Sequence, residues 1–318
     1  MATTEDVVAF LGPKASYTHQ ATLTRFPDSK YTVKPQTTIE DIFAAVQNGT
    51  ASHGVVPFEN SSNGSVVFTL DLFADLNGRY PDILVCGEVY LPVHHCLLGQ
   101  ATPTKVMPTP NQPRVRPQHD IKHIKQLYSH PQAWGQCKIF LSAYLKGVER
   151  QDVSSTSKAA ELVAHDTKGT CAAISSKIAA DLNGLDVLAE GIEDNEGNTT
   201  RFFVIRRRDA LFDGTNAQVG EGTREEHCKT LVSFTVDHGA PGALADCLAT
   251  FKRHDLNLTS INTRPSGEAA WHYVFFVELV GRKLPDGEGG AVNDALLELT
   301  TVAKGWRWLG SWVDELRA

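Results

Sequence analysis

The sequence of 318 residues contains no stretch of roughly 20 consecutive apolar residues, the length that a helix needs to cross a bilayer. Its start, Met-Ala-Thr-Thr-Glu-Asp, lacks the basic segment and the long apolar segment of a secretory signal. We therefore expect neither a membrane span nor secretion.

Cysteine is sparse, and none of the six cysteines forms a Cys-x-x-Cys pair. Neither a zinc site nor a redox motif is indicated, so we expect free thiols in a reducing compartment, by default the cytosol. The phosphate-binding pattern G-x-x-x-x-G-K-[ST] and the dinucleotide pattern G-x-G-x-x-G are also missing. These absences predict no nucleotide cofactor and no metal.

A net charge of -7 and an isoelectric point near 5.9 disfavour a general binder of nucleic acid or of membrane surfaces, since both of those partners are polyanions. Apolar residues make up 42% of the chain and charged residues 21%, as in an ordinary globular protein. The length suggests two or three domains.

Short apolar runs alternate with helical patterns through the first two thirds of the chain, which predicts an α/β architecture. Strands are expected at 7–11, 54–57, 83–89, 93–98, 123–128, 171–174 and 201–206, and helices at 18–26, 39–48, 131–144 and 156–165. The proline-rich stretch 101–118 is predicted to be an inserted loop, and the aperiodic stretch 209–228 a linker.

The residues after the linker predict a separate, smaller unit. The patterns there indicate a strand (230–236), a helix (240–253), two strands (256–263 and 271–280), a loop (281–290), a helix (291–303) and a strand (305–312). This βαββαβ order is the ferredoxin-like arrangement.

Polar residues stand at three junctions between a strand and a following helix. They occupy Phe58–Gly64, Tyr128–Gln132 and Ser154–Ser157. Ligands of α/β proteins bind at the carboxyl ends of strands, and a capped helix start presents free N–H groups to an anion. Three such junctions suggest helix N-termini that converge on a multiply charged anion, although each junction alone also fits a plain capping turn.

A fourth polar segment, Asn198-Thr199-Thr200-Arg201-Phe202, leads into the strand at 201–206. Arg201 suits bidentate binding of a carboxylate, and it equally suits a surface ion pair. His94 and His95 are adjacent, so on a strand they would face opposite sides and one of them would be buried.

These segments occur in the order found in the prephenate dehydratase family, which the sequence resembles over nearly its whole length. Gly12–Ala21 resembles the family segment G-P-x-G-[ST]-[FY]-[ST]-x-x-A, and Val56–Ser61 resembles V-P-[IV]-E-N-[ST]. Tyr128–Gln132 with Gln136-Cys137 is similar to the third segment, and Thr200-Arg201-Phe202 matches T-R-F. Gly242-Ala243-Leu244 resembles the G-A-L element of the family's ACT domain.

The sequence departs from the family pattern at three places. Ala15 replaces a glycine, Phe58 replaces isoleucine or valine, and Ile261–Pro265 reads I-N-T-R-P where E-S-R-P usually stands. The first two changes bear on loop geometry and pocket volume. The third bears on how strongly an effector regulates the enzyme.

The resemblance implies a catalytic region, 6–208, folded like a type II periplasmic binding protein, with two α/β lobes and the substrate between them. A linker (209–228) and an ACT domain (229–318) follow. The implied activity is that of a cytoplasmic carbon–oxygen lyase that converts prephenate to phenylpyruvate in phenylalanine biosynthesis, with feedback inhibition by L-phenylalanine. Two alternatives remain: arogenate dehydratase, and a non-catalytic amino-acid-binding regulator, against which the intact T-R-F and E-N-S segments argue.

The resemblance also implies site residues. The catalytic residues would be Thr200, Glu59 and Arg201, and the substrate-binding residues Ser16, Tyr17, Thr18, Asn60, Ser61, Ser129, Gln136, Thr156 and Phe202. A threonine hydroxyl is far too weak an acid for efficient proton transfer at neutral pH, so we expect Thr200 to act as an oriented hydrogen-bond donor. Glu59 would relay a proton to it if burial keeps the carboxyl group protonated. Aromatisation drives the reaction, so no cofactor is expected.

The effector site is expected at the start of the helix at 240–253. Free N–H groups at Gly242, Ala243 and Leu244 would hold the carboxylate of L-phenylalanine, and the side chain of Asn257 would hold its ammonium group. Arg264 and Pro265 would complete this site by resemblance. ACT domains usually pair across an edge, which implies a homodimer or homotetramer.

Overall fold

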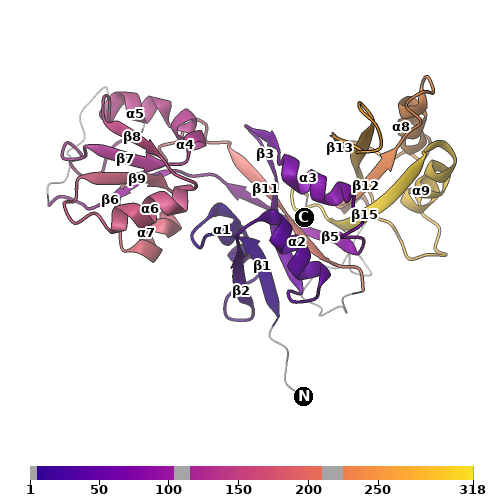
Figure 1. The fold of residues 1–318 in the computed structure, drawn as a ribbon, viewed down its shortest axis with the longest axis horizontal. Helices are drawn as coiled ribbons and strands as arrows, with labels where there is room; N and C mark the ends of the chain where they lie inside the picture. Colours follow the sequence, from indigo (N-terminus) through magenta and orange to yellow (C-terminus); the bar gives the residue numbers. More distant parts are fainter. Residues whose placement is uncertain (1–5, 104–114, 210–224, 318) are drawn as a thin grey trace, which may run out of the picture.

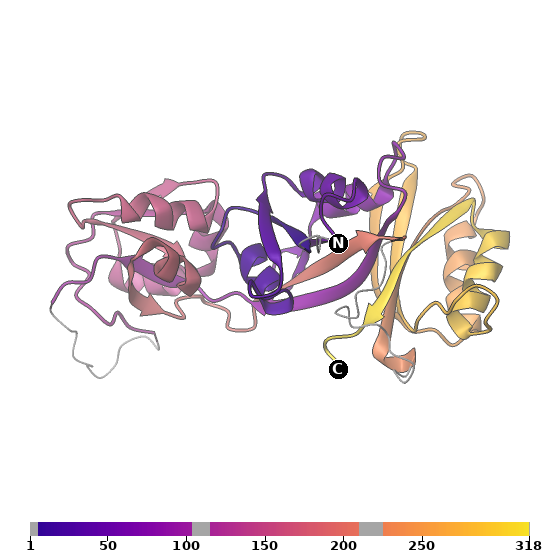
Figure 2. The ribbon, with the colours of Figure 1, turned by 90° about the horizontal axis from the view of Figure 1, so that it is seen from below.

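The computed structural model describes residues 6–103, 115–209 and 225–317, which form three units in a row (Figures 1 and 2). We call them lobe 1, lobe 2 and the C-terminal unit. Lobe 1 lies in the middle, between the other two (Figure 2). No helix within the described ranges is long and apolar enough to span a membrane.

Lobe 1 is built on parallel strands flanked by helices. Its strands are β1 (Val7–Leu11), β2 (Thr32–Gln36), β3 (His53–Asn60), β4 (Gly64–Ser65), β5 (Ile83–Pro92) and β11 (Thr199–Arg207); its helices are α1 (Tyr17–Arg25), α2 (Ile39–Gln47) and α3 (Val67–Ala74). Strand β1 is parallel to β2 and β3, whereas β11 runs antiparallel between β3 and β5. Helix α2 starts at a capping box of Thr38 and Asp41, which satisfies two otherwise free N–H groups.

Lobe 2 has its own five-stranded sheet with the order β10-β6-β9-β7-β8. The strands are β6 (Cys96–Gly99), β7 (Gln126–Ser129), β8 (Glu149–Asp152), β9 (Cys171–Ser175) and β10 (Asp186–Glu190); the helices are α4 (Pro131–Gln136), α5 (Lys138–Tyr144), α6 (Thr156–Ala164) and α7 (Lys177–Asn183). Apolar side chains such as Leu127, Phe140 and Ile174 are fully buried on this sheet.

The C-terminal unit has the expected βαββαβ order. Its elements are a short 3-10 helix (Glu225–His227), β12 (Cys228–Thr235), α8 (Ala243–Arg253), β13 (Leu258–Pro265), β14 (Tyr273–Val280), α9 (Ala291–Val302) and β15 (Gly305–Val313). Its sheet continues into lobe 1, because β15 pairs with β5 in parallel at Gly310 and Val85, and the joint strand order is β13-β14-β12-β15-β5-β11-β3-β1-β2. Aromatic side chains of both units, including Phe203, Phe276 and Trp312, share one core.

The chain crosses between the two lobes twice, at 93–95 and at 191–198, and the crossings are bonded to each other. Val93 N donates to Asn198 O at 2.8 Å, and Ile192 N donates to His95 O at 3.0 Å. The buried Glu193 carboxylate accepts from His95 N at 2.8 Å. We call the two crossings, together with the bonds between them, the hinge.

The α/β class, the two lobes and the ferredoxin-like unit are confirmed, and two element predictions were wrong. The expected helix 131–144 is interrupted at Cys137, where φ is -128°, and forms α4 and α5. The expected strand 93–98 begins only at Cys96, because 93–95 is one of the crossings. Most of the proposed insert 101–118 and of the proposed linker 209–228 lies outside the described residues.

Candidate active site

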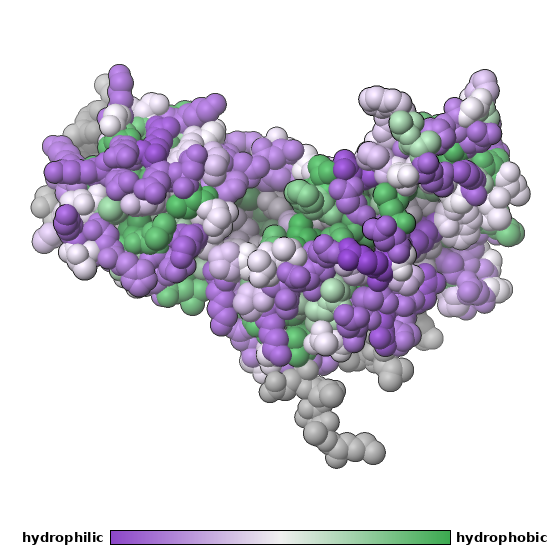
Figure 3. Space-filling view, viewed as in Figure 1, coloured by the Kyte–Doolittle hydropathy of each residue, from purple (hydrophilic) through white to green (hydrophobic). Residues whose placement is uncertain are grey.

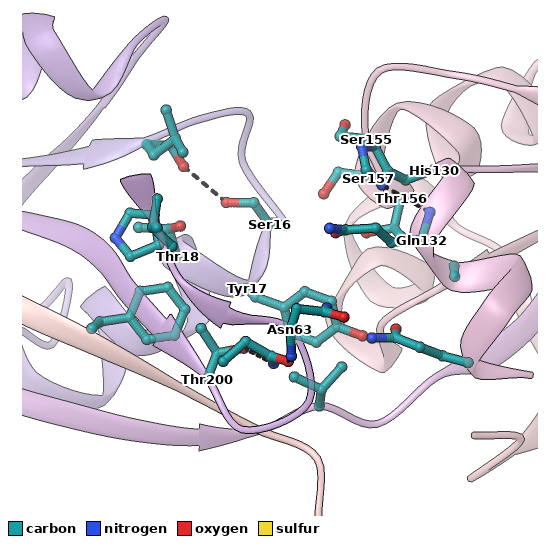
Figure 4. Close-up of a pocket in the computed structure, with 18 of the residues that line it drawn as sticks. Ser16, Tyr17, Thr18, Asn63, His130, Gln132, Ser155, Thr156, Ser157 and Thr200 are labelled. Carbon is teal, nitrogen blue, oxygen red and sulfur yellow. Dashed lines mark hydrogen bonds between the residues drawn. The ribbon is translucent and has the colours of Figure 1, made fainter. Parts of the chain in front are cut away.

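A cleft of about 520 Å³ lies between lobe 1 and lobe 2, where the molecular surface is hollowed (Figure 3). Lobe 1 contributes Ser16, Tyr17, Thr18, Asn60, Asn63, Thr200 and Phe202 among other residues, and lobe 2 contributes His130, Gln132, Gln136, Ser155, Thr156 and Ser157. The two groups face each other across the cleft in Figure 4. The side chains are mostly hydroxyls and amides, which can bind an anion by hydrogen bonds without supplying charge.

Two nine-residue helices begin at this cleft. Ser16 caps α1 by accepting from His19 N, and Ser155 caps α6 by accepting from Lys158 N at 3.0 Å. The first residues of both helices line the cleft. Helix N-termini carry partial positive charge, so both favour a negatively charged group of a ligand.

Ser157, in the first turn of α6, has a hydroxyl oxygen that is buried and without a hydrogen-bond partner. A buried hydroxyl without a hydrogen-bond partner costs stability, and Ser157 is among the residues that line the cleft. This side chain is therefore a candidate ligand contact.

Thr200 is held by Asn60, its partner on the neighbouring strand. Asn60 Nδ2 donates to Thr200 Oγ1 at 2.9 Å and to Asn198 Oδ1 at 2.8 Å. The other side of the amide is fixed as well, since Asn60 Oδ1 accepts from the backbone N–H groups of Ser62 and Asn63. Thr200 Oγ1 is therefore an acceptor toward Asn60, and its own hydrogen is available to donate to a ligand in the cleft.

A second hydrogen-bonded chain joins the two lobes through the hinge. Tyr17 Oη donates to His94 O at 2.9 Å and lies 3.0 Å from His95 Nδ1, while His95 Nε2 lies 2.7 Å from Gln136 Oε1. Burial lowers the pKa of His95 below 6.5. Burial also raises the pKa of Tyr17 well above 10.0, so the phenol stays protonated at neutral pH.

Most of the expected substrate-binding residues come together in this cleft: Ser16, Tyr17, Thr18, Asn60, Gln136, Thr156, Phe202 and also Thr200 line it. Ser61 and Ser129 do not. Ser61 Oγ accepts from Thr199 N at 2.9 Å, and the buried Ser129 Oγ donates to Ile174 O at 2.8 Å, so both hydroxyls bind backbone. Glu59 is half-buried and is also absent from the lining.

Arg201 requires a correction, because its side chain does not reach the cleft. Its guanidinium group is buried on the opposite face of β11, where it pairs with Glu88 and with Glu278 of the C-terminal unit (Arg201 Nε to Glu88 Oε2, 2.8 Å). Burial alone would lower the pKa of Arg201, but the Glu278 and Glu88 carboxylates raise it above its ordinary value. This arginine is permanently charged and already paired, so it cannot clamp a substrate carboxylate.

Several lining residues were missed by the sequence analysis: Asn63, His95, His130, Gln132, Ser155 and Ser157. The polar junctions at Phe58–Gly64, Tyr128–Gln132 and Ser154–Ser157 contained a signal for five of them, since part of each junction lines the cleft. One of the two adjacent histidines was expected to be buried, and this is His95, with 2% of its surface exposed.

The C-terminal unit has a hollow of about 500 Å³ at the start of α8. It is lined by Val236, Asp237, His238, Ala240, Gly242, Ala243, Leu244, Ala245, Leu248 and Phe275. Gly242 precedes the helix with φ at +87°, a conformation that favours glycine, and no atom lies where its Cβ would be.

The remaining expected effector residues lie elsewhere. Asn257, Arg264 and Pro265 do not line this hollow. The guanidinium group of Arg264 instead pairs with Asp71 of α3 at 2.5 Å. Across the described ranges, no three His, Cys, Asp or Glu side chains are grouped to hold a metal ion.

Comparison with known proteins gives matches that agree with one another over nearly the whole chain. Residues 8–210 match the family described as prephenate dehydratase, and residues 230–293 match the ACT domain. A bifunctional chorismate mutase/prephenate dehydratase of Aquifex aeolicus is 36% identical over 97% of this chain and 74% of its own length.

Two solved structures have the same fold over 98% of this chain. One is a prephenate dehydratase of Arthrobacter aurescens in complex with L-Phe, with a TM-score of 0.79 and 29% identity over 91% of its own chain. The other is GqqA, described as a novel type of quorum quenching acylase, with a TM-score of 0.77 and 26% identity over 100% of its own chain.

Proposed function

The chain belongs to the prephenate dehydratase family, and we propose that it binds prephenate in the cleft between its lobes and converts it to phenylpyruvate. The acylase among the similar structures shows that one scaffold can carry different activities, so the proposal depends on the site rather than the fold. The observation that carries it is the Thr200 hydroxyl, which is fixed by Asn60 with a hydrogen free to donate into the cleft.

The reaction breaks two bonds of the ring carbons of prephenate. The carbon–carbon bond to the ring carboxylate breaks and releases CO2, its electron pair enters the ring, and the carbon–oxygen bond to the ring hydroxyl breaks. The oxygen leaves with its electron pair and becomes water once a proton reaches it. Because the ring becomes aromatic, the enzyme needs to anchor the substrate, stabilise the departing oxygen and exclude water from the departing carboxylate. This chemistry makes the enzyme a carbon–oxygen lyase.

Thr200 suits stabilisation of the departing oxygen. Its hydroxyl is a poor acid, but an oriented donor in a partly enclosed cleft stabilises the negative charge that develops on the oxygen. Asn60 holds the donor in place before the substrate arrives, so no reorganisation is needed during the reaction. Glu59 has no place in this proposal, because its side chain does not line the cleft.

The N-termini of α1 and α6 suit the anchoring of the substrate carboxylates. Among the lining residues that the structure describes, there is no lysine and no arginine, so the groups available to an anion are N–H groups, hydroxyls, amides and the imidazoles of His95 and His130. The unpartnered Ser157 hydroxyl supports α6 as one of the two anchors. Phe202, which also lines the cleft, provides the apolar wall beside which loss of CO2 is favoured.

We further propose that L-phenylalanine binds the hollow at the start of α8 and inhibits the enzyme. The N–H groups of Leu244 and Ala245, in the first turn of α8, suit its carboxylate, and the apolar wall of Leu248 and Phe275 suits its ring. The proposal includes pairing of two or more copies through the C-terminal unit, a cytoplasmic location, and the division into a catalytic region (6–208), a linker (209–228) and a regulatory domain (229–318).

The test is turnover of purified protein on prephenate and on arogenate, with and without L-phenylalanine. We expect phenylpyruvate from prephenate, and less of it when L-phenylalanine is added. Turnover of arogenate with little turnover of prephenate would reassign the substrate. Binding of L-phenylalanine with no turnover of either compound would make the chain a non-catalytic regulator and overturn the proposal.

A further inference from the structure

Five charged side chains are buried together where the C-terminal unit meets lobe 1. Arg201 and Glu88 belong to lobe 1, and Lys229, Glu278 and Asp314 belong to the C-terminal unit. Each of the five has at most 7% of its surface exposed. Taking so many charges out of water is costly unless every group is paired and held in a fixed geometry.

The five buried charges are paired with one another and fixed by their neighbours. Arg201 pairs with both glutamates and lies over the rings of Phe58 and Phe203. Thr259 Oγ1 donates to Glu278 Oε1 at 2.6 Å, and Lys229 Nζ lies 2.9 Å from Asp314 Oδ1.

Two strands meet back to back at this point. On β11, Thr200 and Phe202 line the cleft, and Arg201 between them faces the C-terminal unit. On β14, Phe275 lines the hollow at α8, whereas Phe276 and Glu278 face lobe 1. The contact between Arg201 and Glu278 therefore joins the face of β11 that points away from the cleft to the face of β14 that points away from the hollow.

The joint sheet must be strongly curved for Arg201 and Glu278 to be in contact. Strands β12, β15 and β5 separate β14 from β11 in the strand order. In a flat sheet four strand spacings would place them about 19 Å apart. The Arg201–Glu278 ion pair therefore forms only at one particular angle between the C-terminal unit and lobe 1. A change of that angle would displace Arg201, which is next to Thr200 on β11.

We infer that Glu278 is a positioning residue for the dehydratase site: through Arg201 it fixes β11 and, with it, the Thr200 hydroxyl. The inference rests on the proposed function. Small displacements matter here, because a shift of about 1 Å at a catalytic group lowers turnover by up to about a hundredfold. The same contact is a direct mechanical route from the C-terminal unit to the active site, since occupancy of the hollow acts on the other face of β14.

The experiment compares kcat and KM for prephenate in wild-type protein, Glu278→Gln, Thr200→Ala and the double variant. Glu278→Gln keeps the size of the side chain and removes its charge. We expect it to lower kcat about ten- to hundredfold with little change in KM. We expect no further loss when it is added to Thr200→Ala, because a displaced donor matters only while the donor is present.

Two further variants separate positioning from general loosening. Asp71→Asn breaks a different ion pair between the two units, that with Arg264, and it should leave kcat near the wild-type value. Thr259→Val removes only the hydrogen bond that orients Glu278, so it should produce a smaller fall in kcat in a stably folded protein, again absent in the Thr200→Ala background. This milder variant decides the matter if Glu278→Gln does not fold.

The inference is overturned if Glu278→Gln and Thr259→Val turn over prephenate like the wild type. It is also overturned if their effects multiply with that of Thr200→Ala, or if Asp71→Asn lowers kcat as much as they do. A wild-type protein that does not turn over prephenate would instead refute the proposed function, so the two failures are distinct.

A second arm measures L-phenylalanine binding by calorimetry. Glu278 does not line the hollow, so Glu278→Gln should still bind the amino acid while its residual activity responds less to it than the wild-type activity does. Full inhibition of the variant would exclude this contact as the route of regulation.

Discussion

The Thr200 hydroxyl has one proton, and the geometry around it decides where that proton can point. Because Asn60 Nδ2 donates to Oγ1, the threonine hydrogen cannot be used toward Asn60 and is left for the cleft. The donor is therefore oriented by an amide whose own oxygen is bound to two backbone N–H groups. Such preorganisation is what makes a weak acid useful as a stabiliser of charge.

The oriented Thr200 donor predicts the behaviour of three variants in steady-state turnover of prephenate. Loss of one preorganised donor costs about 2.7–4 kcal/mol of barrier, so Thr200→Ala should lower kcat about a hundredfold or more. Thr200→Ser keeps the hydroxyl and should keep much of the activity. Asn60→Asp should also lower kcat, because a carboxylate would accept the threonine hydrogen. A fully active Thr200→Ala enzyme would remove the role.

His95 predicts a pH dependence of stability. Its pKa is lowered by burial in the folded protein, so below pH 6.5 the unfolded chain takes up a proton that the folded protein still resists. The free energy of unfolding should therefore fall as the pH drops from 6.5 to the folded pKa, by at most about 1.4 kcal/mol per pH unit for this group.

Denaturant unfolding of the wild type and of His95→Gln, at one pH above 6.5 and one below it, measures this contribution. The wild type should lose more stability than the variant between the two conditions. Equal losses would mean that His95 does not contribute. A glutamine can still hydrogen-bond to Gln136 or Tyr17, so the comparison isolates the titration rather than the loss of a contact.

The roles of Thr200, Arg201 and Phe202 show how far a motif can be interpreted. As a motif, the three residues were all assigned to the substrate. Side chains on a strand alternate between its faces, so Thr200 and Phe202 in the cleft require Arg201 to point away. The alternation was available from the sequence and predicts this outcome. The identity of the partner, Glu278, was not available, because 77 residues separate the two and no local pattern encodes their contact.

At the level of helices and strands, the start of α6 shows what local sequence can and cannot specify. Ser155 was recognisable as part of a capping junction, and it does cap α6. The direction in which the capped end points depends on where lobe 2 lies relative to lobe 1. That position follows from the hinge bonds of Glu193 and Asn198, which no periodic pattern indicates.

Helix α6 predicts a change in substrate affinity. If Ser157 Oγ binds a carboxylate of prephenate, Ser157→Ala should raise KM with little change in kcat, because the anchor acts equally in ground state and transition state. A hydrogen bond to a charged group contributes about 1.5–3 kcal/mol, so the rise should be about ten- to hundredfold. Ser175→Ala is the matched control: its hydroxyl is also buried and without a partner, but does not line the cleft.

KM for prephenate, measured for the two serine variants in one steady-state assay, decides whether Ser157 anchors the substrate. Ser175→Ala should retain the wild-type KM. An unchanged KM for Ser157→Ala, or an equal rise for both variants, would exclude Ser157 as an anchor and leave α1 as the better supported carboxylate site.

At the scale of the whole molecule, the described residues join the C-terminal unit to lobe 1 by the pairing of β15 with β5, a shared aromatic core, the buried charges around Glu278 and further polar contacts. The pairing of β15 with β5 is formed at one position, Gly310 opposite Val85. Ser65 Oγ donates to Asn262 Oδ1 at 2.6 Å, and Arg264 pairs with Asp71. Residues of the I-N-T-R-P segment thus bind lobe 1, so the departures from the family pattern there lie at the boundary between the two units.

Gly310 predicts how this boundary can be disrupted. Its φ is +129°, and a Cβ atom would lie 2.0 Å from Val85 O. A glycine inside a predicted strand is a sequence signal for a close backbone approach, and this one was present in the segment 305–312. Backbone strain and overpacking together should make Gly310→Ala lower the free energy of unfolding by about 3 kcal/mol or more.

The control for this variant is Gly305→Ala in the same strand, where the nearest atom to an added Cβ is 3.7 Å away and no unusual φ is required. Thermal unfolding and prephenate turnover should be measured for both. If the boundary fixes β11, Gly310→Ala should lower both the melting temperature and kcat, whereas Gly305→Ala should lower neither by much. A destabilised Gly310→Ala protein with wild-type kcat at a temperature where it is fully folded would show that the active site is set within the two lobes alone.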